Sequence, residues 1–294
     1  MNSVEKVRII SIAAITLLLT TAISLNAAEV GPAKGSLVLV GGNMRDDAIV
    51  KRIIDLAGGP DELIVIIPTA GGARDYNQDY GVVGQFRASG AKNIEVIHTY
   101  NRGVADSEEF VEPLRRARGV FFGGGQPWRL ADAYLNTRTH RELQALLDRG
   151  GVISGNSAGA TFLGAFLTRG DTKGPQVIMG DHQQGLGFLR DFAFDGHLLQ
   201  QNRQWDLIEV IRARPNLLGV GIDEDTAIVV QQDEFEVIGR SYVGIYDNRR
   251  LIPPNGLFYF LAPGNRYNLA TREASRLTKN QTTVRRVEKD VWPK

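Results

Sequence analysis

Short, uninterrupted apolar runs that end near glycine or proline are the feature that most constrains the fold of this chain. They recur along its first half, at intervals that leave room for a helix between successive runs. The runs are Ser36–Val40, Leu63–Ile67, Ile94–Ile97, Val120–Phe122 and Val152–Ser154. Strands without polar alternation are buried on both faces, as in a parallel sheet covered by helices. The pattern therefore predicts an α/β protein with a doubly wound, mostly parallel sheet.

Helices are expected between these strands, and the clearest covers Thr139–Arg149. Thr139 and Glu142 have the spacing of a capping box, and Gly150 can end the helix. After Pro215 the pattern changes to shorter apolar segments joined by turns, which predicts extra C-terminal strands. These segments are Leu218–Ile222, Ala227–Val230, Phe235–Ile238, Val243–Tyr246 and Leu257–Phe260.

The N-terminus has the order of residues found in secretory signals. Two basic residues precede an uncharged apolar run over Ile9–Leu25, and small residues follow it. We therefore expect residues 1–28 to direct export to the periplasm or the medium, as a cleaved signal or as an uncleaved anchor. Residues 29–272 are expected to form a single α/β domain, followed by a basic tail over residues 273–294. No stable membrane contact is expected once the signal is removed.

Composition narrows the chemistry that this chain can perform. The 294 residues include no cysteine and four histidines, and the formal net charge is +1. Without cysteine there is no disulfide scaffold, thiolate zinc site or cysteine nucleophile. A charge near zero gives no reason to expect a nucleic-acid partner. No histidine–carboxylate set has the spacing of metal ligands, so we expect neither a metal nor a cofactor.

The strongest chemical motif is Gly155–Gly159, which reads G-x-S-x-G with Ser157 at its centre. It follows the expected strand Val152–Ser154 and precedes an expected helix over Ala158–Leu167. A strand, a sharp turn and a helix are the context of a nucleophile elbow, which exposes the serine hydroxyl at the carboxyl end of a sheet. The alternative is a close-packed glycine turn without catalytic function.

Backbone N–H groups near this turn could stabilise an oxyanion. Ala158 follows the serine directly, so its N–H would be one donor. The second donor should come from another loop at the same sheet edge. Gly124 and Gly125 follow the expected strand Val120–Phe122 and are well placed to supply it.

A serine nucleophile needs a base, which is usually histidine. His140 begins the expected surface helix, and His182 lies in a polar loop. His98 and His197 each end an expected strand, where side chains converge on a sheet edge. Spacing alone favours His197 over His98 without excluding either.

The acid that would orient the imidazole is not fixed by these patterns. Asp171 follows the expected elbow helix, and Glu224 lies in the acidic segment Gly221–Ala227. Either carboxylate could hold the ring, and either could be an ordinary surface charge.

Together these motifs resemble the cyanophycinase and dipeptidase E family of serine peptidases, over roughly Leu37 to Arg272. The segments that carry the resemblance are Val120–Gln126 (VFFGGGQ), Gly155–Ala160 (GNSAGA), Phe194–His197 (FDGH), Gly221–Ala227 (GIDEDTA) and Leu261–Arg272. The family has a fold similar to class I glutamine amidotransferases, with serine in place of cysteine at the elbow. The resemblance therefore implies this flavodoxin-like sheet for the present chain.

The resemblance also implies catalytic roles. It assigns the base to His197, and it implies a chain order in which the acid lies between Ser157 and His197. Asp171 fits that order, so we expect Asp171 rather than Glu224 to orient the imidazole.

The sequence departs from the family where substrate would be recognised. Cyanophycinases carry an arginine-rich run after the catalytic histidine, which would hold aspartate carboxylates. Here the stretch Leu198–Asp206 keeps Arg203, while Gln201 and Asp206 occupy the other two positions. The residues expected to contact substrate are Gln126, Asp195 and Arg203. Fewer arginines mean less bidentate recognition of carboxylates, so we do not expect cyanophycin itself to be the substrate.

The resulting hypothesis is an exported serine peptidase that cleaves a peptide or isopeptide bond at an aspartyl or β-aspartyl residue, through an acyl-enzyme on Ser157. It needs no partner other than this substrate, and it allows a homodimer. Two alternatives remain open. The altered arginine run would suit a non-catalytic protein that binds a small ligand, and the elbow would also suit a broader serine esterase or amidase.

Overall fold

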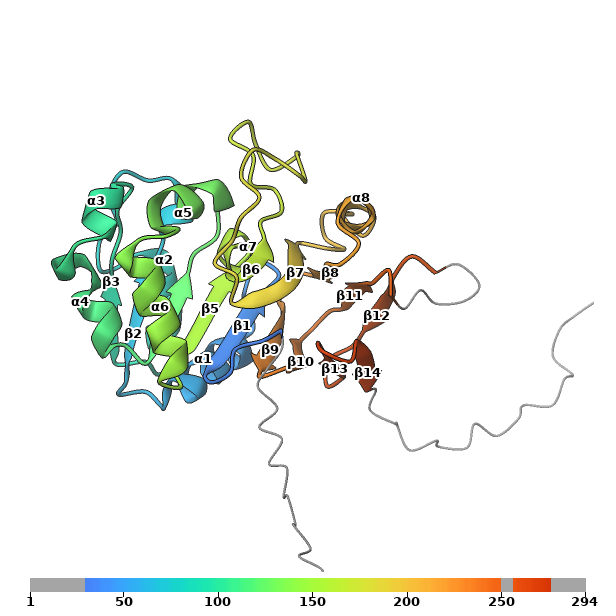
Figure 1. The fold of residues 1–294 in the computed structure, drawn as a ribbon. Coiled ribbons are helices and arrows are strands. Elements are labelled where there is room, and N and C mark those ends of the chain that lie inside the picture. The colour runs from blue at the N-terminus through green and yellow to red at the C-terminus, as the bar shows by residue number, and fades with distance from the viewer. Residues whose placement is uncertain (1–29, 250–255, 276–294) are drawn as a thin grey trace, which may run out of the picture.

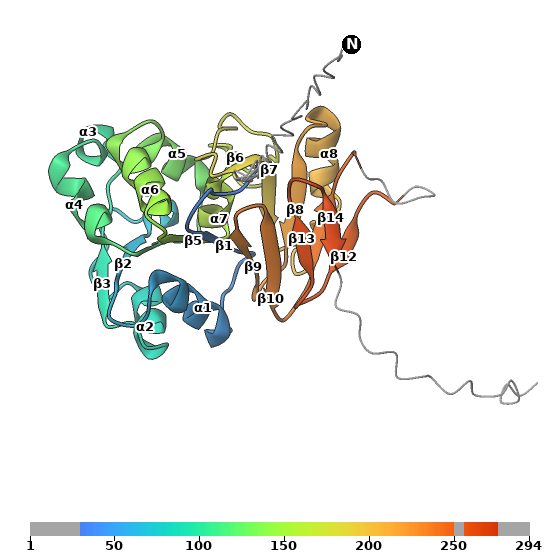
Figure 2. The same ribbon diagram turned by 60° about the horizontal axis from the view of Figure 1, so that its bottom comes forward.

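The computed structural model describes residues 30–249 and 256–275. Within them the strands form two sheets that lie beside each other (Figures 1 and 2). One has nine strands in the order β14-β13-β10-β9-β1-β5-β4-β2-β3, and the other has five in the order β12-β11-β8-β7-β6. The expected signal over residues 1–28 and most of the expected tail lie outside the described residues.

The predicted parallel sheet forms the centre of the larger sheet. Its parallel strands are β1 (Ser36–Val40), β5 (Val152–Asn156), β4 (Gly119–Phe122), β2 (Leu63–Ile67) and β3 (Asn93–Val96). Every residue of β1, β2 and β4 is buried, which is why these strands are apolar without alternation. The predicted α/β fold class is confirmed.

Helices cover both faces of this sheet, α1 and α2 on one side and α3 to α6 on the other (Figure 2). The helices are α1 (Asp47–Ala57), α2 (Gly81–Ala88), α3 (Arg102–Ala105), α4 (Glu108–Arg116), α5 (Pro127–Tyr134) and α6 (Arg138–Asp148). Successive strand residues point to opposite faces. Accordingly Leu37 and Leu39 pack with residues of α4 to α6, whereas Val38 and Val40 pack with residues of α1 and α2. Each such buried side chain contributes roughly 1.5–3 kcal/mol.

The later strands divide between the two sheets. Those that extend the larger sheet are β9 (Thr226–Gln231), β10 (Glu234–Gly239), β13 (Arg266–Asn268) and β14 (Glu273–Ser275). Those of the smaller sheet are β6 (Gly164–Phe166), β7 (Leu189–Gly196), β8 (Leu218–Ile222), β11 (Val243–Tyr246) and β12 (Tyr259–Leu261). The helix α8 (Asp206–Ala213) packs on the smaller sheet, and α7 (Ala158–Leu163) contacts strands of both.

Three sequence expectations need correction. The elbow helix ends at Leu163 and not at Leu167, because the chain becomes extended at Gly164 and pairs with β7. Thr139 does not cap α6, since its hydroxyl donates to the carbonyl of Ala105. The boundary at residue 272 falls too early, because Glu273–Ser275 pairs with β13 as a strand.

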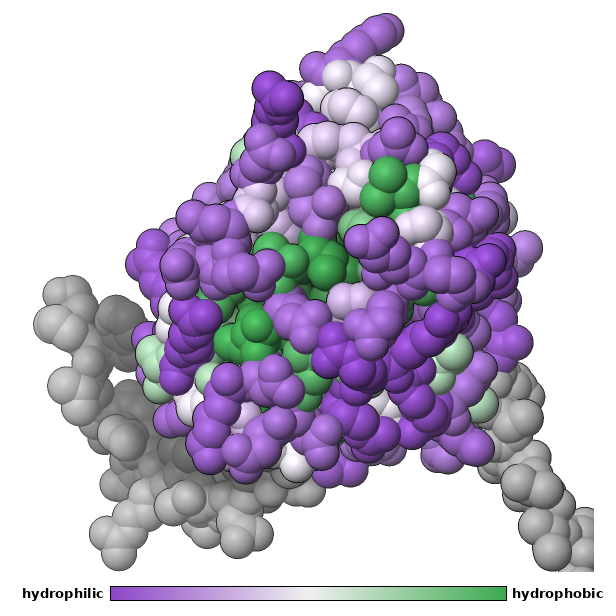
Figure 3. All heavy atoms as spheres, turned by 90° about the vertical axis from the view of Figure 1, so that its left-hand side faces the viewer, coloured by the Kyte–Doolittle hydropathy of each residue, from purple (hydrophilic) through white to green (hydrophobic). Residues whose placement is uncertain are grey.

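Apolar side chains gather in a hollow at the β3 end of the larger sheet, on the side shown in Figure 3. The hollow is lined by Ile97, Val104, Phe110 and Pro113 among others. In the part of the chain that the structure describes, no helix is both long and apolar enough to cross a membrane.

Candidate active site

Ser157 lies at the turn between β5 and α7, with φ 54° and ψ −114°. This left-handed conformation is costly for a residue with a side chain, and such strain is typical of functional sites. Close packing behind the turn holds it. A Cβ at Gly155 would lie 2.3 Å from the carbonyl carbon of Gly159, and one at Gly159 would lie 2.4 Å from the oxygen of Phe122. The sequence motif therefore forms the strand, sharp turn and helix of a nucleophile elbow.

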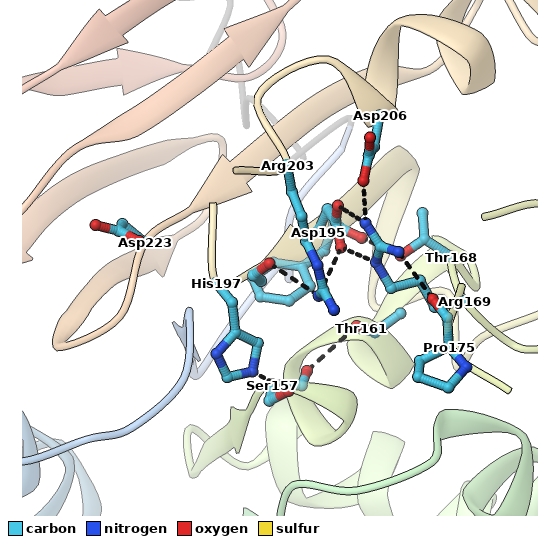
Figure 4. Close-up of polar contacts among 12 residues, drawn as sticks. Ser157, Thr161, Thr168, Arg169, Pro175, Asp195, His197, Arg203, Asp206 and Asp223 are labelled. Atoms are coloured by element: carbon cyan, nitrogen blue, oxygen red, sulfur yellow. Dashed lines mark hydrogen bonds and ion pairs between the residues drawn. The ribbon is translucent and has the colours of Figure 1, made fainter. Parts of the chain in front are cut away.

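A line of hydrogen bonds connects the serine to a histidine and an acid. Ser157 Oγ lies 2.9 Å from His197 Nε2, and His197 Nδ1 lies 2.7 Å from Glu224 Oε1. His197 follows β7 and Glu224 follows β8, and these strands pair in parallel, with Gly196 opposite Ile222. Their carboxyl ends therefore meet, and Figure 4 shows His197 pointing from this edge toward Ser157.

The expected preference for Asp171 over Glu224 is wrong. The Asp171 carboxylate accepts hydrogen bonds from the backbone N–H groups of Lys173 and Asp181, at 2.8 and 3.2 Å, within its own loop. Glu224 reaches His197 instead, because β7 and β8 are neighbours. The chain order is thus serine, histidine, acid.

Glu224 lies in a three-residue connection that crosses from one sheet to the other. Asp223, before it, accepts hydrogen bonds from the N–H groups of Leu199 and Gln200, just after His197. Asp225, after it, accepts from the N–H groups that follow β1, at Arg45 and Asp46. The two flanking carboxylates therefore hold the loops on either side of the relay.

The Glu224 carboxylate is kept ionised by its partners. Burial disfavours its charge, but hydrogen bonds from His197 and from Asn43 Nδ2 outweigh burial and hold the pKa of Glu224 below its ordinary value. A charged acid fixes the imidazole with its proton on Nδ1, which leaves Nε2 free to accept a proton from Ser157.

The glycines after β1 make room for the imidazole. A Cβ at Gly42 would lie 2.3 Å from His197 Cε1, and the carbonyl of Gly41 accepts the N–H of His197 at 2.8 Å. Sequence reasoning missed Gly42 and Asn43. Their signal was the Gly41-Gly42 pair at the carboxyl end of a buried strand, which is where α/β proteins place their sites.

The other histidines have different surroundings. His98 Nδ1 lies 2.8 Å from Thr69 Oγ1, between the rings of Tyr76 and Tyr100. His140, which was expected on a surface helix, is half-buried, with Nε2 3.1 Å from the Leu186 carbonyl. Of the histidines, all of which the structure describes, His197 is the one bonded to Ser157.

The expected oxyanion residues gather beside the serine. Ala158 is the first residue of α7, where N–H groups have no carbonyl partner within the helix. A Cβ at Gly124 would lie 3.5 Å from Ser157 Cβ, so the glycine loop runs alongside the nucleophile. Gly125 has φ 142°, and a Cβ there would lie 2.1 Å from the Ala70 oxygen. The position of these groups fits the predicted role.

A pocket of about 350 Å³ opens next to the serine, and Gly125, Ser157, Ala158, His197 and Arg203 are among the residues that line it. The Arg203 side chain is 14% exposed. Its Nη1 donates to the Gly196 carbonyl at 3.2 Å and lies 3.8 Å from Asp195 Oδ1. The sequence predicts that Arg203 lies at the site, and Arg203 does line the pocket.

Arg169 is a pocket residue that sequence reasoning missed. It makes a bidentate pair with Asp195, at 2.7 Å through Nε and 2.8 Å through Nη2. Its Nη2 also pairs with Asp206, and its Nη1 donates to the Pro175 carbonyl at 2.8 Å (Figure 4). Every guanidinium nitrogen of Arg169 is therefore engaged within the protein.

Two expected substrate contacts are placed differently. Asp195 does line the pocket, but it is buried and both of its carboxylate oxygens accept from Arg169, so its clearest role is to hold that arginine. Gln126 is not among the lining residues, and its backbone N–H donates to Ala70. The Gln126 Oε1 atom is buried without a hydrogen-bond partner in the described ranges.

An elbow serine, a histidine, a carboxylate and a glycine loop at the edge of an α/β sheet define a serine hydrolase. Residues 37–238 match peptidase family S51, and the chain belongs to that family. It is therefore a serine-type peptidase, and the resemblance drawn from the motifs is confirmed.

Curated relatives and solved structures agree with this assignment. The chain is 29% identical over 266 residues to a cyanophycinase of Geminocystis herdmanii, covering 82% of this chain and 96% of that protein. It is 32% identical over 262 residues to a cyanophycinase of Synechococcus elongatus, covering 82% and 81%. The crystal structure of a peptidase from an acI-B1 actinobacterium is similar with TM-score 0.61 and 25% identity, over 80% of this chain and 97% of that one. A putative peptidase E protein from Listeria monocytogenes, at TM-score 0.51 and 16% identity over 70% and 99%, supports the fold alone.

Proposed function

We propose that this peptidase hydrolyses a peptide or isopeptide bond next to an aspartyl residue, and a β-aspartyl linkage in particular. The observation that carries the proposal is the hydrogen-bonded line Ser157–His197–Glu224, which opens on a pocket that contains Arg203. The line of three side chains supplies the chemistry, and Arg203 supplies a cation for a substrate carboxylate.

The chemistry follows from the positions of the atoms. As Ser157 Oγ attacks the carbonyl carbon, His197 Nε2 accepts the hydroxyl proton, and N–H groups of Ala158 and of Gly124 or Gly125 stabilise the oxyanion. His197 then passes the proton to the leaving amine, the C–N bond breaks and an acyl-enzyme remains. Water, deprotonated by His197, attacks the acyl group and releases the acid with Ser157 restored.

The charges of the pocket favour a substrate with one carboxylate near the scissile bond. Every guanidinium nitrogen of Arg169 is engaged, whereas within the described ranges Arg203 uses Nη1 alone, for the Gly196 carbonyl and a longer contact of 3.8 Å with Asp195. Its remaining N–H groups can form a bidentate pair with a carboxylate. A β-aspartyl residue presents its α-carboxyl group close to the carbonyl under attack, which suits a single guanidinium.

A hydrolysis panel tests the proposal. It compares β-Asp-Arg dipeptide, β-Asp-Arg polymer, α-Asp dipeptides and simple esters, each with the parent and with Ser157→Ala. We expect the β-Asp-Arg dipeptide to give the highest kcat/KM, with turnover lost in Ser157→Ala by a factor of about 10⁴ or more. Faster turnover of esters than of all aspartyl substrates would contradict the aspartyl specificity. Equal turnover by Ser157→Ala would contradict the mechanism.

The proposal includes export, which is supported by Lys6 and Arg8 ahead of the apolar run Ile9–Leu25. Mass spectrometry of the protein from a periplasmic or culture fraction measures the outcome. We expect a mass lower than that of the full chain by about the first 28 residues. Full-length protein in the cytoplasmic fraction would refute export.

A further inference from the structure

The connection between β6 and β7, residues 167–188, forms one wall of the pocket. We call it the pocket loop. It extends from α7 and β6 at the top of Figure 1, and its residues Pro175 and Gln176 line the pocket beside Ser157. The loop contains no helix, and β-pairing within it is limited to a bridge at Gln184. Backbone hydrogen bonds near its ends, such as that from Leu186 N–H to the Phe162 carbonyl, and side-chain contacts together fix its position.

Within the loop, two aspartates organise the backbone. Asp171 accepts the N–H of Asp181, and Asp181 in turn accepts the N–H and the hydroxyl of Thr172, at 3.0 and 2.6 Å. A Cβ at Gly180 would lie 2.4 Å from that of Asp171, so the two sides of the loop are in close contact. The loop is therefore a compact unit, and the ion pairs of its Arg169 with Asp195 and Asp206 hold it to β7 and α8.

A further contact of the loop is made by His182, which lies between two carboxylates. Its Nδ1 is 2.8 Å from Asp181 Oδ1, and its Nε2 is 2.9 Å from Asp132 Oδ1. Asp132 belongs to α5, which begins at Pro127, directly after the glycine loop beside Ser157. The imidazole thus connects the pocket loop to the helix that continues the glycine loop.

The number of N–H groups on the His182 ring decides whether it can donate to both carboxylates. A neutral imidazole has one N–H, and an ionised carboxylate can only accept hydrogen bonds. Both contacts are hydrogen bonds at the same time only when both ring nitrogens are protonated. In the neutral ring, one nitrogen lone pair would face a carboxylate oxygen, and that contact would be repulsive.

The groups around His182 also favour the doubly protonated ring. Burial lowers the pKa of His182, but its hydrogen bonds to Asp181 and Asp132 outweigh burial and raise the pKa above the ordinary value. Hydrogen bonds from Thr172 and His182 lower the pKa of Asp181 to about 2, so that carboxylate stays ionised. Arg102 of α3 lines a second hollow together with Asp132 and His182, and its guanidinium donates to the carbonyls of Asp132 and Leu135.

We propose that His182 is a positioning residue that, as an imidazolium, fixes the pocket loop to α5 through Asp132 and so makes the width of the substrate pocket depend on pH. The contact is complete below the ordinary histidine pKa, which is about 6.5. Because the folded-state pKa is raised, the contact is lost as the pH rises through that higher value. The loop is then held by its other contacts alone, among them the ion pairs of Arg169.

The test pairs Asp132→Asn with Asp148→Asn, a matched control on α6 whose carboxylate accepts from Gln144 of the same helix. Hydrogen exchange followed by mass spectrometry gives protection factors for residues 169–187 at pH 6 and pH 9. In the parent and in Asp148→Asn we expect protection to fall about fivefold at pH 9, the size of one partly exposed charge-assisted hydrogen bond. In Asp132→Asn we expect low protection at both values. Equal protection at both pH values in the parent, or parent-like behaviour of Asp132→Asn, would overturn the proposal.

Two further measurements separate this role from a merely structural one. NMR titration of the His182 ring should give a lower pKa in Asp132→Asn than in the parent, and an unchanged pKa would count against the contact. The KM for β-Asp-Arg dipeptide should rise between pH 6 and pH 9 in the parent and not in Asp132→Asn. This kinetic measurement rests on the proposed function. If no substrate is turned over, that function fails, while exchange and titration still decide the role of His182.

Discussion

The two halves of the active site are held in place by different kinds of interaction. The catalytic half is fixed by the backbone: Ser157 lies in a strained turn, and His197 bonds the Gly41 carbonyl and occupies space that a side chain at position 42 would fill. The half proposed to recognise substrate consists of the pocket loop and Arg203, and charged side chains, chiefly Arg169, hold it in place. The difference indicates that substrate preference can change by substitution while the catalytic geometry stays intact.

The largest expected difference between the halves comes from replacing one acid in each half by its amide. Glu224→Gln should lower kcat/KM by about 10²–10⁴, because the amide no longer favours the imidazole tautomer and charge that catalysis needs. Asp171→Asn should leave kcat nearly unchanged, since Asp171 bonds backbone N–H groups of its own loop. Steady-state kinetics on one aspartyl substrate measures both. A larger loss of kcat in Asp171→Asn would restore the assignment that the sequence favoured.

A second change tests whether charge pairing holds the recognition half. Arg169→Met should lower the free energy of unfolding by about 3–5 kcal/mol, because it leaves the Asp195 carboxylate buried without its partner. Urea denaturation measures this loss. The control is Arg240→Met, which removes an exposed pair with Asp46 and should cost about 0.5 kcal/mol or less. Equal costs for the two variants would mean that the buried pair contributes no more than a surface one.

The smallest expected effect separates recognition from catalysis. Arg203→Met should raise KM for an aspartyl substrate by about tenfold to a hundredfold, the value of a lost charge-assisted hydrogen bond, with a smaller change in kcat. The KM of Arg203→Lys should lie between those of the parent and of Arg203→Met, because lysine keeps the charge without the bidentate geometry. Michaelis–Menten kinetics at one pH decides the outcome. A loss confined to kcat would place Arg203 in the catalytic half.

Local patterns predicted the parts of the fold that are locally determined. The strands Ser36–Val40 and Leu63–Ile67 begin and end as their buried apolar runs indicate. The elbow at Ser157 was also visible, because Gly155 is required by its contact with Gly159 within the same strand, turn and helix.

The rest of the site depends on which strands become neighbours. Glu224 reaches His197 because β7 pairs with β8, and nothing in either segment states that pairing. Arg169 lay unnoticed for the same reason, since its partner Asp195 is 26 positions away. Contacts between distant segments decide side-chain pairs of this kind, and apolar periodicity carries no information about them.

The proposed nucleophile and its proposed base follow strands of different sheets, Ser157 after β5 of the larger sheet and His197 after β7 of the smaller one. A shift of about one ångström between the sheets would stretch the 2.9 Å contact beyond hydrogen-bonding length, while each sheet kept its own ladder of hydrogen bonds. The catalytic rate should therefore depend on how the two sheets are aligned. On gentle heating, activity should fade before secondary structure melts, and it should return on cooling as soon as the sheets realign.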